Sequence, residues 1–157
     1  MGVNPIAIVR PDAWDVPLFL HVLGALVLVG ALTLTAAFLF AAWRGGSTAS
    51  LRLGLRSLTL GVIPAWIVLR FSAEWIAEKE GFNEVDDPPS WLNIGYIASE
   101  GGLLLIIIAG VLGWRAYRKL RDGQGEPGTT TRVAATLLTI VLVLSVVAIW
   151  AMTTKPA

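Results

Sequence analysis

The chain has 157 residues, of which 55% are hydrophobic and 15% are charged, and its formal net charge is +1. Soluble domains carry roughly 25% charged residues, so too little polar surface is present here to coat a soluble fold. The absence of cysteine excludes a disulfide scaffold, a cysteine-based zinc site and thiol chemistry. The near-neutral net charge gives no reason to expect a nucleic-acid partner.

Four segments are apolar enough to cross a lipid bilayer, whose core of about 30 Å needs roughly 20 helical residues. These predicted spans are 16–43, 55–77, 91–117 and 133–154. The second predicted span is the least apolar of the four. Only 13 uncharged residues precede Arg70, so a helix long enough to cross the bilayer must include Arg70 and Glu74. The third is interrupted by Glu100.

The connections between these spans are short except for residues 78–89. Short connections favour antiparallel neighbours, so we predict an all-α membrane protein: one domain over residues 1–157, built as an up-down bundle of four transmembrane helices. Small residues recur at helical spacing on the third span and can seat a helix of the same chain or of a second copy. They are Gly95, Ala98, Gly102, Ala109 and Gly113. Pro64 predicts a kink that frees the carbonyl of Leu60.

The charges predict how the bundle is oriented. The first and third connections, with their flanking residues, hold eight bases and two acids, whereas residues 78–89 hold five acids and one base. Basic loops lie on the cytoplasmic side, so both termini and the acidic loop are expected outside a bacterial cytoplasmic membrane. Basic side chains near the inner surface are also expected to meet anionic lipid headgroups. Six of the seven tryptophans fall at span ends, as in an interfacial aromatic belt: Trp14, Trp43, Trp75, Trp91, Trp114 and Trp150.

Depth arithmetic pairs two of the charges inside the spans. Arg70 follows 13 uncharged residues and Glu100 precedes 14, which puts both about 20 Å above the inner boundary. We therefore predict an Arg70–Glu100 ion pair, with Glu74 as a second partner at i+4. Either the pair only fixes two helices in register, or it belongs to an outward-facing polar pocket with His21 that holds an anion on Arg70 or relays a proton through Glu100.

His21 is the only histidine, and it is placed near the outer end of the first span. Met152 is placed near the outer end of the last span, which neighbours the first in an up-down bundle. A histidine and a methionine can form an axial pair for haem, with Arg70 meeting the propionates, whereas two histidine ligands from one chain are excluded. Otherwise His21 is an interfacial polar residue and Met152 is apolar filler. The acidic loop lacks the spacing of a calcium loop, so no metal site is expected.

The sequence contains no recognisable catalytic constellation. We therefore expect a non-enzymatic integral membrane protein with a ligand-binding or transport-accessory role, in which His21, Arg70, Glu74 and Glu100 bind the ligand. Two alternatives remain open: a b-type haem electron carrier that uses His21 and Met152, and a structural subunit of a homo-oligomer or a larger membrane complex.

Two short runs carry a resemblance to a known family. Residues 20–25 (LHVLGA), followed by Gly30, open the first span, and residues 151–156 (AMTTKP) close the last. Together they resemble small bacterial four-helix integral membrane proteins that are distantly similar to the copper-resistance-D-like group. The resemblance implies a four-helix fold and, in the wider group, copper or haem handling by histidines on several helices. In this chain, the residues that match the functional positions of that group are His21 and Lys155.

Overall fold

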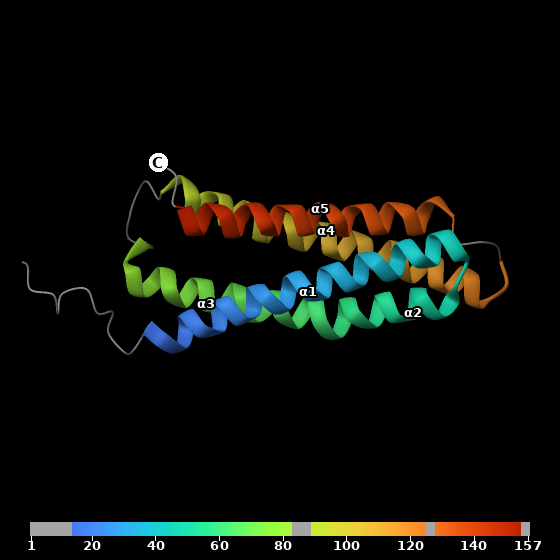
Figure 1. Ribbon diagram of the computed structural model, residues 1–157, viewed down its shortest axis with the longest axis horizontal. Coiled ribbons are helices and arrows are strands. Elements are labelled where there is room, and N and C mark those ends of the chain that lie inside the picture. The colour runs from blue at the N-terminus through green and yellow to red at the C-terminus, as the bar shows by residue number, and fades with distance from the viewer. Residues whose placement is uncertain (1–13, 83–88, 125–127, 155–157) are drawn as a thin grey trace, which may run out of the picture.

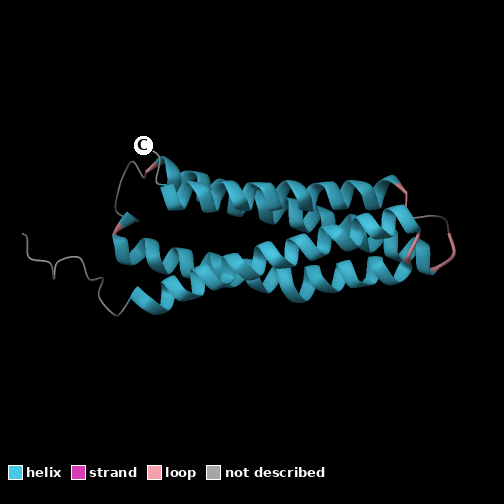
Figure 2. Cartoon of the chain, in the orientation of Figure 1, coloured by secondary structure: helices cyan, strands magenta, loops and turns pink. Residues whose placement is uncertain are grey.

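The computed structural model describes residues 14–82, 89–124 and 128–154. Over these residues the chain is helical, with short turns and no strand (Figures 1 and 2). Its elements are α1 (Asp15–Gly45), α2 (Thr48–Ser57), the π-helical turn η3 (Leu58–Val62), α3 (Ile63–Glu80), α4 (Ser90–Arg121) and α5 (Thr129–Thr154). Since α2, η3 and α3 continue one another over 33 residues, the described chain has four helical rods long and apolar enough to cross a membrane.

The rods are longer than the apolar segments of the sequence. The second rod begins at Thr48, seven residues before the predicted start at 55, and α4 continues to Arg121 rather than ending at 117. Helical hydrogen bonding continues into polar sequence until a cap ends it. Gly46 supplies such a cap after α1 with a φ of 63°, and Ser47 begins α2 by accepting a hydrogen bond from the amide of Ser50 at 3.2 Å.

α1 lies at the centre of the packing. It contacts α2, α3 and α5, while α4 packs against α5 and, at one end, against α2. The largest fully buried side chains come from all four rods: Leu32, Leu39, Leu51, Ile106 and Leu138. Figure 1 shows that the start of α1 and the end of α5 lie at one end of the molecule, the open end, and that the turns after α1 and α4 lie at the other, the basic end.

The small residues of α4 are used within the chain. A Cβ added at Gly102 would lie 3.5 Å from Val141 of α5, and one added at Gly113 would lie 3.1 Å from Leu55 of α2. A Cβ at Gly95 would overlap the methyl group of Met152 on α5. At these three glycines, α4 therefore packs against helices of the same chain, which is one of the two arrangements that the sequence allows.

The second rod changes partner along its length. α2 packs against both α1 and α4, whereas the longer α3 stays with α1 and makes few contacts with α4. The π turn η3 separates the two parts: the amide of Ile63 donates to the carbonyl of Leu58, five residues back, and Pro64 follows at once. A wide π turn therefore lies just before Pro64, the residue at which the sequence predicts a kink.

Two close approaches, one from η3 and one from α3, hold the second rod against α1. A Cβ added at Gly61 would lie 2.9 Å from the Cβ of Ala31, and one added at Gly24 would lie 3.1 Å from the backbone nitrogen of Leu69. A side chain at Gly61 requires a shift of its neighbour, and one at Gly24 requires the backbone of Leu69 to give way by a few tenths of an ångström. As a consequence α3 and α4 separate toward the open end, where Figure 1 shows the α1/α3 pair diverging from α4 and α5.

The contact at Gly24 gives a stability prediction. We expect Gly24→Leu to lower the free energy of unfolding by about 1–3 kcal/mol, because the new side chain must displace the backbone of α3. Gly30→Leu is the matched control, since nothing lies within 4 Å of a Cβ there and the helix propensity gained is the same. Unfolding in detergent micelles measures both, and equal effects would contradict the proposed close approach.

Candidate functional site

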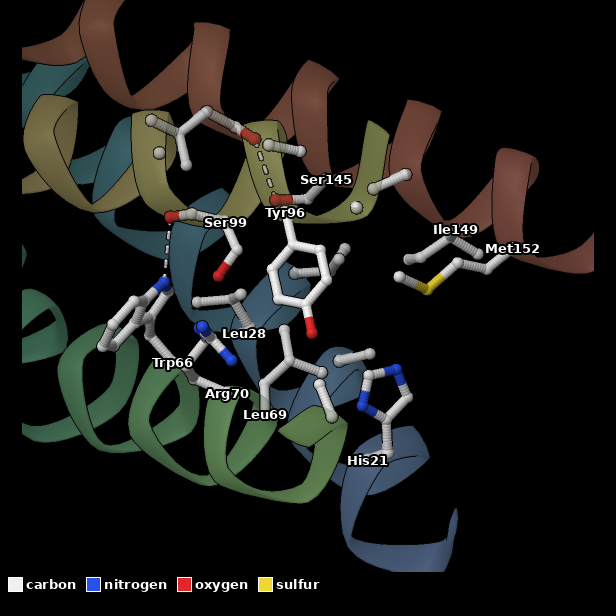
Figure 3. Close-up of a pocket in the computed structure, with 18 of the residues that line it drawn as sticks. His21, Leu28, Trp66, Leu69, Arg70, Tyr96, Ser99, Ser145, Ile149 and Met152 are labelled. Carbon is white, nitrogen blue, oxygen red and sulfur yellow. Dashed lines mark hydrogen bonds between the residues drawn. The ribbon is translucent and has the colours of Figure 1, made fainter. Parts of the chain in front are cut away.

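A pocket lies between the two diverging pairs of helices. Its empty space is about 830 Å³ when the part open to the surroundings is counted, and residues from α1, α3, α4 and α5 line it. Its walls are mainly apolar, with Leu28, Leu69 and Ile149 among them (Figure 3). The polar or charged side chains that line it are His21, Trp66, Arg70, Tyr96, Ser99 and Ser145. The pocket is therefore apolar, with a few polar groups in its walls.

Arg70 is the centre of a small charge network on the pocket wall. Its Nε donates to Oε1 of Glu100 at 3.0 Å, and its Nη1 donates to Oε1 of Glu74. The side chain of Arg70 is 24% exposed and that of Glu100 is 58% exposed, so the guanidinium is the more enclosed partner. Both pairings predicted from the sequence are confirmed. Arg70 lines the pocket, and the two carboxylates lie beyond its lining.

Two aromatic side chains complete this wall. The guanidinium of Arg70 lies 5.0 Å from the centre of the Tyr96 ring, and the indole Nε1 of Trp66 donates to the backbone carbonyl of Ser99 at 3.1 Å. These contacts, with the Arg70–Glu100 pair, bridge α3 and α4 where the helices diverge. Sequence reasoning missed them, although Trp66 stands four residues before Arg70 and Tyr96 four before Glu100, and so on the same helix faces.

His21 occupies a different wall. It is half-buried on α1, one turn before Gly24, and the close approach there places its ring against the backbone of Leu69. Its Nδ1 is buried, and within the described chain it makes no hydrogen bond of normal geometry. No hydrogen bond joins His21 to Arg70, Glu74 or Glu100 among the described residues. The four predicted site residues thus divide into a network of three and a separate histidine.

Met152 lines the same pocket from α5 (Figure 3). Its methyl group rests on the backbone of α4 at Gly95, which has no side chain to exclude it. His21 and Met152 therefore stand on walls contributed by α1 and α5. Among residues 14–82, 89–124 and 128–154, no group of three or more His, Cys, Asp or Glu side chains could hold a metal ion. Lys155 and the loop positions 83–88 lie outside the described residues.

Comparison of the chain with protein-family models, with curated proteins and with solved structures found no match.

Removal of Arg70 should cost more than removal of either acid. Arg70→Leu leaves Glu74 and Glu100 close together without a cation, so we expect a loss of about 2 kcal/mol in the free energy of unfolding. Glu100→Leu should cost less, because Glu74 still pairs with Arg70. The double variant Arg70→Leu/Glu100→Leu should recover part of the loss.

A double-mutant cycle in micelles measures this coupling. Arg44→Leu serves as the control, because Arg44 is an exposed arginine in the last turn of α1. Additive effects of Arg70→Leu and Glu100→Leu would contradict a stabilising ion pair.

Proposed function

We propose that the chain is a multi-pass protein of a bacterial cytoplasmic membrane, with its four rods in an antiparallel up-down arrangement and both termini outside. Its pocket opens toward the outer side and takes up a small amphipathic molecule, in a ligand-binding or transport-accessory role rather than in catalysis. The observation that carries the proposal is the apolar pocket at the open end with Arg70 and Tyr96 in one wall.

The distribution of charge supports the orientation. The basic end carries arginines of the helices that adjoin its two turns, among them Arg44, Arg52 and Arg121. Arg132 lies 5.2 Å from the ring centre of Trp43 at this end, an arrangement suited to a membrane interface. The pocket lies toward the opposite end, so the positive-inside rule directs it outward.

The composition of the pocket indicates its ligand. A void between helices in lipid loses dispersion contacts, which an apolar molecule restores. Arg70 already faces two carboxylates, so the network has a formal charge of −1 and opposes an anion. A ligand with an apolar body and a neutral or cationic hydrogen-bonding end fits better than the anion considered from the sequence.

Haem ligation by His21 and Met152 is a second candidate, because both side chains line one pocket from facing walls. Two features weigh against it. The methyl group of Met152 is packed on α4, and Arg70, the expected partner of the propionates, is already paired.

A pocket-filling variant tests ligand uptake. Ala25 lines the pocket and Ala37, on the same helix, is exposed, so Ala25→Phe and Ala37→Phe add the same ring at different places. We expect the wild type and Ala37→Phe to purify with an organic molecule that mass spectrometry detects, and Ala25→Phe to lose it. Identical extracts from a folded Ala25→Phe would contradict the proposal.

The absorption spectrum of the same samples separates the two candidates. We expect no Soret band. A Soret band in the wild type that disappears in both His21→Leu and Met152→Leu would contradict the amphipathic ligand and identify haem as the bound molecule.

The orientation is tested by labelling, since the chain has no native cysteine. Thr48 and Lys79 are exposed at opposite ends of the second rod. An impermeant maleimide applied to intact cells should label Lys79→Cys but not Thr48→Cys, and both should react after permeabilisation. The reverse pattern would place the pocket on the cytoplasmic side.

A further inference from the structure

A second hollow lies at the basic end, between α2 and α4, and none of its residues belongs to the pocket described above. We call it the arginine groove. It forms where α2 still packs against α4, before the second rod turns away at η3. Its lining residues are Arg52, Leu55, Arg56, Leu58, Thr59, Gly110, Trp114, Tyr117 and Arg121.

The polarity of the arginine groove changes along its length. On α4 the lining runs from Gly110 through Trp114 and Tyr117 to Arg121, a rise of about 16 Å. Apolar surface thus comes first, aromatic rings second and a cation last. On α2 and η3 the two arginines, Arg52 and Arg56, also lie nearer the end of the bundle than Leu58 does. This sequence of environments matches the acyl, carbonyl and phosphate levels of a bilayer leaflet.

The arginine groove has an exposed aromatic wall above a closely packed apolar floor that includes the buried Leu58. A Cβ added at Gly110 would lie 3.3 Å from Leu58, so the glycine lets the two helices come close and leaves a smooth apolar floor. The ring centres of Trp114 and Tyr117 are 5.8 Å apart, and Trp114 is 53% exposed. An exposed indole beside an apolar floor offers contact area to an acyl chain.

The charge of the arginine groove is positive and largely uncompensated. Arg52 and Arg56 stand at i and i+4 on one face of α2, and neither forms an ion pair within the described residues. Arg121 pairs with Asp122 at 3.0 Å, and no acidic residue lines the groove. Like charges four residues apart repel each other, so a bound anion between Arg52 and Arg56 removes a local cost.

We propose that the arginine groove binds one anionic glycerophospholipid from the leaflet on the basic side. Arg52 and Arg56 hold its phosphate by charge-assisted hydrogen bonds, and Arg121 closes the site from α4. Trp114 and Tyr117 meet the glycerol and ester region, and an acyl chain runs over Leu58 and Gly110. The apolar floor distinguishes this occupant from a free phosphate ion, which would use only the arginines.

Native mass spectrometry of the full chain, purified in a neutral detergent, tests the proposal with phosphatidylglycerol as the probe. Phosphatidylcholine and inorganic phosphate are the comparison ligands. We expect one phosphatidylglycerol to be retained, phosphatidylcholine to bind much more weakly and inorganic phosphate not to compete at equal concentration. Each arginine should contribute about fivefold, so Arg52→Gln/Arg56→Gln should weaken binding roughly 30-fold.

Arg44→Gln/Arg118→Gln is the matched control. It removes the same charge from exposed positions in the last turns of α1 and α4, outside the arginine groove. Retention of the lipid by this control supports the proposal, whereas equal weakening in both variants would show a general surface-charge effect and overturn it. Full competition by inorganic phosphate would overturn the acyl-chain part, and absence of a retained lipid would overturn the whole. All four substituted arginines are exposed, and unchanged unfolding temperatures confirm that the variants fold.

Discussion

The guanidinium of Arg70 lies on a helix that is otherwise apolar enough to cross a bilayer, and a charge at such a position is stable only when it is paired. Glu74 supplies a partner on the same helix, but Glu100 supplies one on α4, from which α3 has already diverged. The need to neutralise this cation therefore ties together two helices that pack poorly. With the hydrogen bond from Trp66 to Ser99, it closes one side of the pocket and keeps the gap from widening.

The divergence has its origin in backbone geometry. η3 and Pro64 lie where the second rod changes partner, and the glycines at 24 and 61 let η3 and α3 lie almost in backbone contact with α1. These missing side chains favour packing of α3 on α1, and α3 makes few contacts with α4. The same rod thus produces two different sites: the arginine groove where α2 still meets α4, and the apolar pocket where α3 has left it.

The sequence predicted the features that depend on distance along a helix. Arg70 and Glu100 were paired because the uncharged stretches before and after them have nearly equal length, and helical rise converts length directly into depth. Features that depend on the rotation of each helix about its axis were not predicted. Tyr96 and Trp66 reach the site because of how α3 and α4 face each other, and His21 turns into the pocket because Gly24 lets α1 approach Leu69. The pocket is a gap in side-chain packing between helices, and a pattern of residue types along the sequence does not predict such a gap.

The pocket and the arginine groove differ in the sign of their net charge, and this difference predicts that they bind different ligands. At the open end two carboxylates face one arginine, so a ligand there gains most from the apolar walls and needs only a neutral or cationic end. In the arginine groove only Arg121 is paired, with Asp122, while Arg52 and Arg56 form no ion pair within the described residues, so a ligand there must bring negative charge. A single anionic lipid species would therefore be repelled from the pocket and attracted to the arginine groove. A neutral amphipathic molecule would have the opposite preference, because only the pocket encloses its apolar body on four helices.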